Sequence, residues 1–176
     1  MSVLQLRLLG DPVLTTPARE VTAFDRSLHT LIEDMRETML DAPGIGLAAP
    51  QVGVSLRVLV YQTADDEQGH LCNPVLELAD EQEEAEEGCL SLPGLTVMVP
   101  RAVQLTARGV DCTGAPQTLT ATGLLARCLQ HETDHLDGIL TIDRTTREER
   151  RRAMREIREA PWFASPVTAA PSRHWA

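Results

Sequence analysis

The sequence predicts an α+β fold: a single domain in which mixed or antiparallel sheets pack around a central buried helix, with another helix at the C-terminus. A chain of 176 residues, 43% of them hydrophobic, can build one sizeable core but hardly two. Strand-like and helix-like patterns do not alternate regularly along the chain, as a parallel α/β fold would require. Helical periodicity is clear at residues 24–40, 122–136 and 145–159.

The first helix is predicted at residues 24–40, where five apolar side chains recur every three or four positions: Leu28, Leu31, Ile32, Met35 and Met39. Asp25 is its expected N-cap, and Pro43-Gly44 ends it. The following run, Gly44-Ile45-Gly46-Leu47-Ala48-Ala49-Pro50-Gln51, contains too much glycine and proline to predict regular structure.

Short strands are predicted in the middle of the chain. Residues 56–61 form a buried strand, and residues 72–78 form an interrupted or edge strand because they contain Asn73-Pro74. The acidic run at 80–87 is interpreted as a solvated loop or hairpin. Residues 95–99 and 103–107 are predicted strands on either side of Pro100-Arg101.

Two helices complete the predicted domain. Apolar residues nearly encircle the helix at 122–136, so we expect it to be central and buried. The last helix, residues 145–159, is highly charged and has a capping-box start at Thr145-Thr146-Arg147-Glu148-Glu149. The expected domain spans residues 1–160, and residues 161–176 are expected to be a flexible tail.

Composition excludes several classes of function. The chain has 16 basic and 26 acidic residues, and its net charge of −10 disfavours broad contact with nucleic acid or anionic lipid. We find no secretory signal and no run near the ~18 apolar residues of a membrane span. Four cysteines without a disulfide-type spacing indicate reduced thiols. We therefore expect a cytoplasmic protein without membrane association or direct nucleic-acid specificity.

The most specific motif is His131-Glu132-Thr133-Asp134-His135. Positions four apart on a helix are separated by only about 40° around its axis, so both imidazoles can bind one metal ion. Glu132 lies about 100° from His131, which places its carboxylate beside the metal as a general base. In a buried helix these polar groups require partners, which favours a metal site over a solvated surface.

A catalytic ion of this kind needs a third protein ligand, and spacing leaves two candidates open. Cys128 lies three residues before His131, on roughly the same helical face. Cys89, in the sequence Glu87-Gly88-Cys89-Leu90-Ser91, is the remote alternative.

Three blocks of the sequence resemble, in order, the three motifs of the bacterial peptide deformylase family. They are the Gly44–Gln51 run, Glu87-Gly88-Cys89-Leu90-Ser91 and Gln130-His131-Glu132-Thr133-Asp134-His135. Leu9-Gly10-Asp11-Pro12-Val13-Leu14 also resembles the family's N-terminal signature, and the likeness extends over about residues 4–158. The resemblance implies a cytoplasmic enzyme that hydrolyses the N-formyl group from the formylmethionine of nascent polypeptides and releases formate.

The resemblance also implies roles for individual residues. Cys89 would be the third ligand beside His131 and His135, holding one divalent ion. Fe²⁺ is expected as the native ion, with Zn²⁺, Ni²⁺ or Co²⁺ in the isolated protein. The side-chain amide of Gln51 and the backbone N–H of Leu90 would stabilise the oxyanion, while Glu132 transfers protons.

The expected substrate pocket is carried over by the same analogy. Gly44 and Gly46 would let the backbone approach the substrate. The methionine side chain would lie among Ile45, Leu124, Leu125 and Cys128. Arg127 departs from relatives that have an apolar residue there; its stem could line the pocket while its guanidinium reaches water. Arg101 is a candidate partner of Asp134 that would brace the ligand helix.

The sequence also allows two alternative functions and one possible binding partner, the ribosome. A metallo-endopeptidase using the same helix would need a downstream ligand such as Glu148 or Glu149. A catalytically inactive, ribosome-associated homologue would be expected to have lost a ligand or Glu132, and no such substitution is present. Residues 144–159 contain seven arginines against four glutamates, and in relatives a basic C-terminal helix docks at the ribosome.

Overall fold

The computed structural model describes residues 2–62 and 68–164 and confirms the predicted α+β class. Five strands form one antiparallel sheet in the order β1-β2-β3-β6-β7. They are β1 (Gly46–Ala48), β2 (Val58–Gln62), β3 (Gln68–Leu78), β6 (Gln104–Val110) and β7 (Pro116–Thr122). A separate antiparallel hairpin consists of β4 (Gln82–Cys89) and β5 (Leu92–Ala102).

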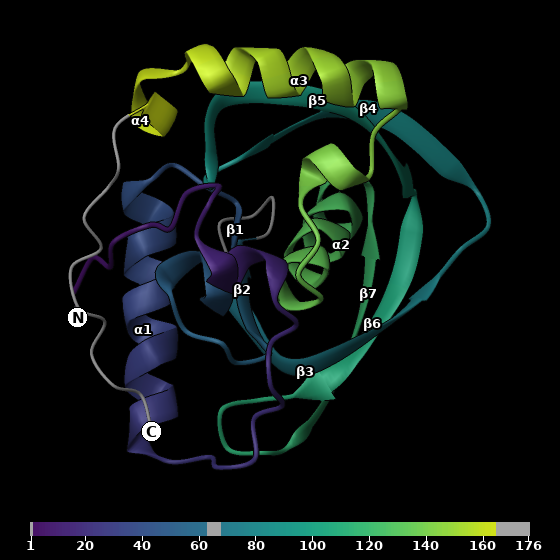
Figure 1. The fold of residues 1–176 in the computed structure, drawn as a ribbon. Coiled ribbons are helices and arrows are strands. Elements are labelled where there is room, and N and C mark those ends of the chain that lie inside the picture. Colours follow the sequence, from purple (N-terminus) through teal and green to yellow (C-terminus); the bar gives the residue numbers. More distant parts are fainter. Residues whose placement is uncertain (1, 63–67, 165–176) are drawn as a thin grey trace.

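The helices lie around and between these sheets. They are α1 (Arg26–Asp41), α2 (Gly123–Leu136), α3 (Arg147–Glu159) and α4 (Pro161–Ala164), with 3₁₀ turns η1 (Pro12–Thr15), η2 (Ala49–Val52) and η3 (Thr141–Asp143). Figure 1 shows α2 in the middle of the molecule, with the curved β3-β6-β7 side of the sheet around it and α3 crossing over β5. No helix among the described residues is long and apolar enough to cross a membrane.

The predicted helix boundaries agree closely with the structure. Asp25 accepts hydrogen bonds from the backbone N–H groups of Ser27 and Leu28 and so caps α1. In α2, Ala126, Leu129 and Leu136 are buried against Leu59, Leu71 and other sheet residues of one core cluster. Thr146 caps α3 by accepting from the Glu149 N–H, and Ala153 and Ile157 attach that helix to the β5 core.

Three strand predictions need correction. Residues 46–48, placed in an irregular segment, form the edge strand β1, which pairs with residues 59–61. β3 is interrupted as predicted, with a register shift between Cys72 and Val75, but it lies inside the sheet between β2 and β6. Asn73 adopts φ 51° at this shift, and its side chain exchanges two hydrogen bonds with the Val21 backbone. Pro100 and Arg101 lie within β5, not between strands.

The C-terminal boundary of the domain stays a prediction. Pro161–Ala164, the start of the expected tail, form the short helix α4, and the Trp162 indole N–H donates to the Pro93 carbonyl. The remainder of that expected tail, residues 165–176, lies outside the described residues.

Candidate metal centre

Helix α2 and the end of strand β4 bring three donor atoms together. The Nε2 atoms of His131 and His135 lie 3.2 Å apart, and the Cys89 Sγ lies 3.2 Å from the His135 Nε2. All three donor atoms lie within 4.8 Å of one another, as ligands of a single ion would. The register of β4 and β5 shifts between Gly88 and Cys89, so the hairpin turns sharply where the thiol meets the helix.

Two further observations test whether these residues fit a metal ion. Glu132 is buried beside the donors, and its Oε2 has no hydrogen-bond partner among the described residues. Burial opposes ionisation of the Cys89 thiol, but the neighbouring imidazoles of His135 and His131 outweigh it and hold its pKa well below its ordinary value. A thiolate and two imidazoles suit a divalent transition metal, so the donor set fits.

Cys128, the other candidate ligand, points elsewhere. Its thiol donates to the Ile45 carbonyl at 3.4 Å, and burial raises its pKa well above the ordinary value. A protonated thiol is a poor ligand. The rival downstream ligand Glu149 pairs with Arg152 at 2.7 Å on α3, outside the donor cluster.

A buried carboxylate, that of Glu87, orients His131 by binding the ring nitrogen that faces away from the donor cluster. Glu87 accepts from the His131 Nδ1 at 3.0 Å and from Arg101 at 2.9 and 3.0 Å. Burial alone would raise the pKa of Glu87, but the hydrogen bonds from His131 and Arg101 and the Arg101 charge lower it to about 2. An ionised Glu87 keeps the His131 Nε2 directed at the donor cluster.

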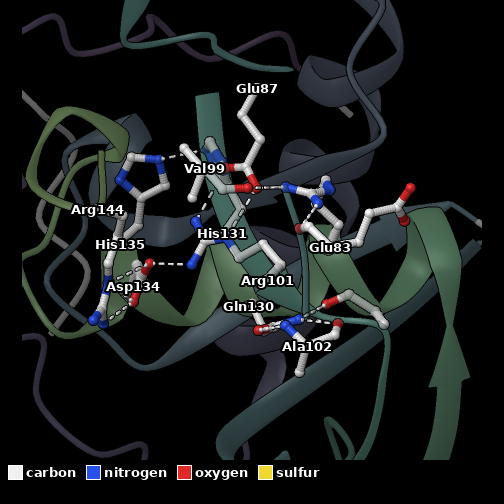
Figure 2. A network of polar contacts seen from close by, with 12 residues as sticks. Glu83, Glu87, Val99, Arg101, Ala102, Gln130, His131, Asp134, His135 and Arg144 are labelled. Atoms are coloured by element: carbon white, nitrogen blue, oxygen red, sulfur yellow. Dashed lines mark hydrogen bonds and ion pairs between the residues drawn. The ribbon is translucent and has the colours of Figure 1, made fainter. Parts of the chain in front are cut away.

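The same network continues to the far side of α2. Arg101 pairs with Asp134 at 2.6 Å, and Arg144 pairs with Asp134 at 2.5 Å. Figure 2 shows this chain of charges running from Glu87 through Arg101 to Asp134 and Arg144. The expected Arg101–Asp134 brace is therefore present, with Arg101 buried between two carboxylates.

A cavity of about 720 Å³ opens onto these groups. Its lining includes Glu132, Gln51, Leu90 and six residues predicted for the substrate pocket: Gly44, Ile45, Gly46, Leu124, Arg127 and Cys128. Leu125 is not among the lining residues, because it packs into the core cluster on the other side of α2. Ile45 and Leu124 expose 42% and 65% of their surface at its rim.

The first motif requires glycine at one position for steric reasons. A Cβ on Gly46 would lie 2.5 Å from both the Cys128 Sγ and the Glu132 Oε1. Gln51 follows in the same motif and is buried; its Oε1 accepts from the Ala48 N–H, which directs its Nε2 to Ser91 Oγ at 3.4 Å and Cys89 Sγ at 3.7 Å.

Sequence reasoning missed the contribution of the N-terminal segment. The Arg7 N–H donates to the Gln51 carbonyl at 2.7 Å, and the Leu9 N–H donates to the Ser91 carbonyl at 3.1 Å. Leu6 lines the cavity, as do residues 92–96 at the start of β5. The apolar character of residues 3–9 was the available signal, but periodicity does not reveal which loops such a segment will join.

The fold and this centre together define a class, that of the metal-dependent hydrolases. The sequence model of the polypeptide deformylases matches residues 3–151. The chain is 56% identical over 174 residues to a peptide deformylase of Acidothermus cellulolyticus, covering 99% of this chain and 96% of that protein. The chain belongs to the polypeptide deformylase family. It is a metalloenzyme that removes the N-formyl group from nascent peptides.

Other relatives and solved structures support the same family membership. Peptide deformylase 1 of Corynebacterium glutamicum is 50% identical over 167 residues, which are 93% of this chain and 99% of that protein. A peptide deformylase structure from Legionella pneumophila superposes with a TM-score of 0.85 at 43% identity, covering 90% and 95% of the two chains. One from Synechococcus elongatus, in complex with actinonin, gives 0.83 at 42% identity and covers 93% and 91%.

Proposed function

We propose that deformylation takes place where the cavity meets the Cys89–His131–His135 cluster, with one divalent ion, natively Fe²⁺, held by those three side chains. The observation that carries the proposal is the convergence of these donors beside Glu132, whose Oε2 is buried and unpartnered among the described residues. The thiolate ligand and the imidazoles are compatible with Fe²⁺, and with Zn²⁺, Ni²⁺ or Co²⁺ in the isolated enzyme. When bound, such an ion lowers the pKa of water toward ~7 and polarises the formyl carbonyl.

Glu132 is the group placed to move protons. Burial raises the pKa of its carboxyl, while the charges of His131 and His135 lower it, so the net raised value favours both taking up and releasing a proton. Glu132 takes a proton from the attacking water as its oxygen adds to the formyl carbon. It then gives a proton to the departing amine nitrogen as the C–N bond breaks, which leaves formate and the free N-terminus.

Gln51 and Leu90 are proposed to stabilise the oxyanion. The Gln51 Nε2 already faces the cluster, 3.7 Å from the Cys89 Sγ, because its Oε1 is fixed by the Ala48 N–H. Leu90 lines the same cavity one residue after the ligand Cys89. Its backbone N–H would act as the second donor.

Gln51→Leu is expected to lower kcat about 10²–10³-fold, because one oxyanion donor contributes about 2.7–4 kcal/mol. Metal content should remain that of the wild type, since Gln51 is not a ligand. Steady-state kinetics on a formylmethionyl dipeptide measure the effect. A kcat within about threefold of wild type would show that Gln51 only fills space.

The function itself is tested by assaying the purified chain on formylmethionyl dipeptides and on unformylated peptides, with metal analysis of the same sample. We expect one divalent ion per chain and formate release only from the formylated substrates. Cleavage of internal peptide bonds would indicate an endopeptidase. A folded, metal-loaded protein that releases no formate would indicate an inactive homologue.

The basic face of α3 is a proposed ribosome contact in the cytoplasm. Three arginines of this face are exposed: Arg147, Arg151 and Arg155. Within the described residues, 2–62 and 68–164, they form no ion pair. Deleting α3 would remove the buried Ala153 and Ile157 and uncover the β5 core residues against which they pack, so substitution is the cleaner test.

Changing Arg147, Arg151 and Arg155 together to glutamine should weaken ribosome co-sedimentation at low salt, because these charges attract a polyanion and salt screens them. A matched triple change at the exposed Arg19, Arg26 and Arg108 should leave co-sedimentation unchanged. Equal losses in both variants would indicate a nonspecific charge effect and not an α3 contact.

A further inference from the structure

Arg127 does not extend into water as expected but spans the β4–β5 hairpin. Its Nη1 donates to the Glu87 Oε1 at 2.9 Å and to the Val99 carbonyl at 2.8 Å. Its Nη2 donates to the Glu83 carbonyl at 2.7 Å. Only 13% of its side chain is exposed. One guanidinium from α2 thus contacts both strands of the hairpin, whose first strand β4 ends at Cys89. The acceptors Glu83, Glu87 and Val99 are labelled in Figure 2.

Glu87 connects this contact to the metal centre. One of its oxygens accepts from Arg127 and Arg101, and the other accepts from Arg101 and from the His131 Nδ1. Arg127 and His131 are four residues apart, so both lie on the same face of α2, one turn apart. The Glu87 carboxylate, two residues before Cys89, is therefore attached to the helix at two successive turns.

The two arginines bind Glu87 from different elements. Arg101 belongs to β5, so its bonds to Glu87 lie within the hairpin, while its pair with Asp134 joins β5 to α2. Arg127 belongs to α2, so its bonds join the hairpin to the helix that carries both histidines. The Glu87 side chain is only 5% exposed, and such a desolvated, charge-assisted contact is stronger than a surface ion pair.

We propose that Arg127 is a positioning residue that sets the distance between Cys89 and the histidine pair by fastening β4 and β5 to α2. This rests on the proposed Cys89–His131–His135 ligand set. The planar fork of arginine is needed because the acceptors lie on different strands; a lysine ammonium is a point charge and can satisfy fewer of them at once. Arg127 also lines the cavity, so the same side chain that forms its wall holds the third ligand in place.

The test uses Co²⁺ as a probe ion in the full-length chain, because its visible spectrum responds to ligand set and geometry. Arg127→Leu should lower Co²⁺ affinity about 10–100-fold, the usual effect of removing a side chain that orients a ligand. Its spectrum should also change. Arg127→Lys should recover part of the affinity. Arg108→Leu, which removes an exposed arginine paired with Glu77 across β6 and β3, should match wild type.

Measuring Co²⁺ binding by Cys89→Ala as well distinguishes failure of the Arg127 inference from failure of the proposed ligand set. If Cys89→Ala binds Co²⁺ as tightly as wild type, the proposed ligand set is wrong. If Cys89→Ala loses Co²⁺ while Arg127→Leu keeps wild-type affinity and spectrum and only melts earlier, Arg127 is merely structural and the inference is overturned. Should Arg127→Leu not fold, wild-type affinity and spectrum in Arg127→Gln would overturn it equally.

Discussion

Glu132→Gln is expected to lower kcat for formylmethionyl dipeptides by about 10²–10⁴-fold, the usual contribution of a general acid–base group. Glutamine keeps the volume of the buried side chain but cannot accept a proton from water or donate one to the amine. KM should change little, because the other residues that line the cavity are untouched and glutamine keeps the shape of the side chain. Steady-state kinetics and metal analysis on the same preparation measure the effect.

The matched control is Glu84→Gln, an exposed position on β4 that should retain full activity. Metal content should be equal in wild type and both variants, since Glu132 is not one of the clustered donors. A Glu132→Gln enzyme with wild-type kcat and full metal loading would assign proton transfer to another group.

The second large effect concerns stability. Arg101→Met should lower the free energy of unfolding by about 3–5 kcal/mol, because breaking a buried ion pair leaves uncompensated charge. Arg101 is buried between Glu87 and Asp134, and methionine supplies similar bulk without a donor. In a domain of this size the loss corresponds to a drop in Tm of roughly 6–20 °C.

Denaturant and thermal unfolding should both be followed on metal-free protein, so that weaker metal binding does not enter the comparison. Arg108→Met is the control, since its pair with Glu77 is more than half exposed and should contribute no more than about 1 kcal/mol. A small change in both variants would mean that Arg127 and Arg144 alone can compensate the two buried carboxylates.

Local patterns were sufficient to predict the helices and the central part of the site. The apolar spacing of α1 and its Asp25 cap are properties of adjacent residues, and so is the His131–His135 spacing on α2. These features follow from helical geometry alone. The edge strand β1 was missed because its pairing with β2 is a tertiary interaction that overrides a glycine-rich composition.

Long-range geometry explains what periodicity left undecided. Cys89 and His135 are separated by 46 residues, so no local pattern shows that the hairpin turn brings that thiol to the helix. Only the family resemblance favoured Cys89 over Cys128. The prediction that the Arg127 guanidinium reaches water was wrong for the same reason. Its acceptors at 83, 87 and 99 belong to a hairpin whose position on α2 depends on the whole fold.

The backbone bonds from Arg7 and Leu9 to Gln51 and Ser91 mean that a segment distant in sequence helps to hold the two loops of the site. Residues 7–9 are synthesised before either loop, so they find their acceptors only after both loops have emerged. A variant that lacks residues 1–9 would still contain all three metal-binding side chains. It would lack the two backbone hydrogen bonds that hold the loops of Gln51 and Ser91 in place. A change that pulls residues 7–9 away from these loops is therefore expected to lower turnover, even though neither Arg7 nor Leu9 lines the cavity.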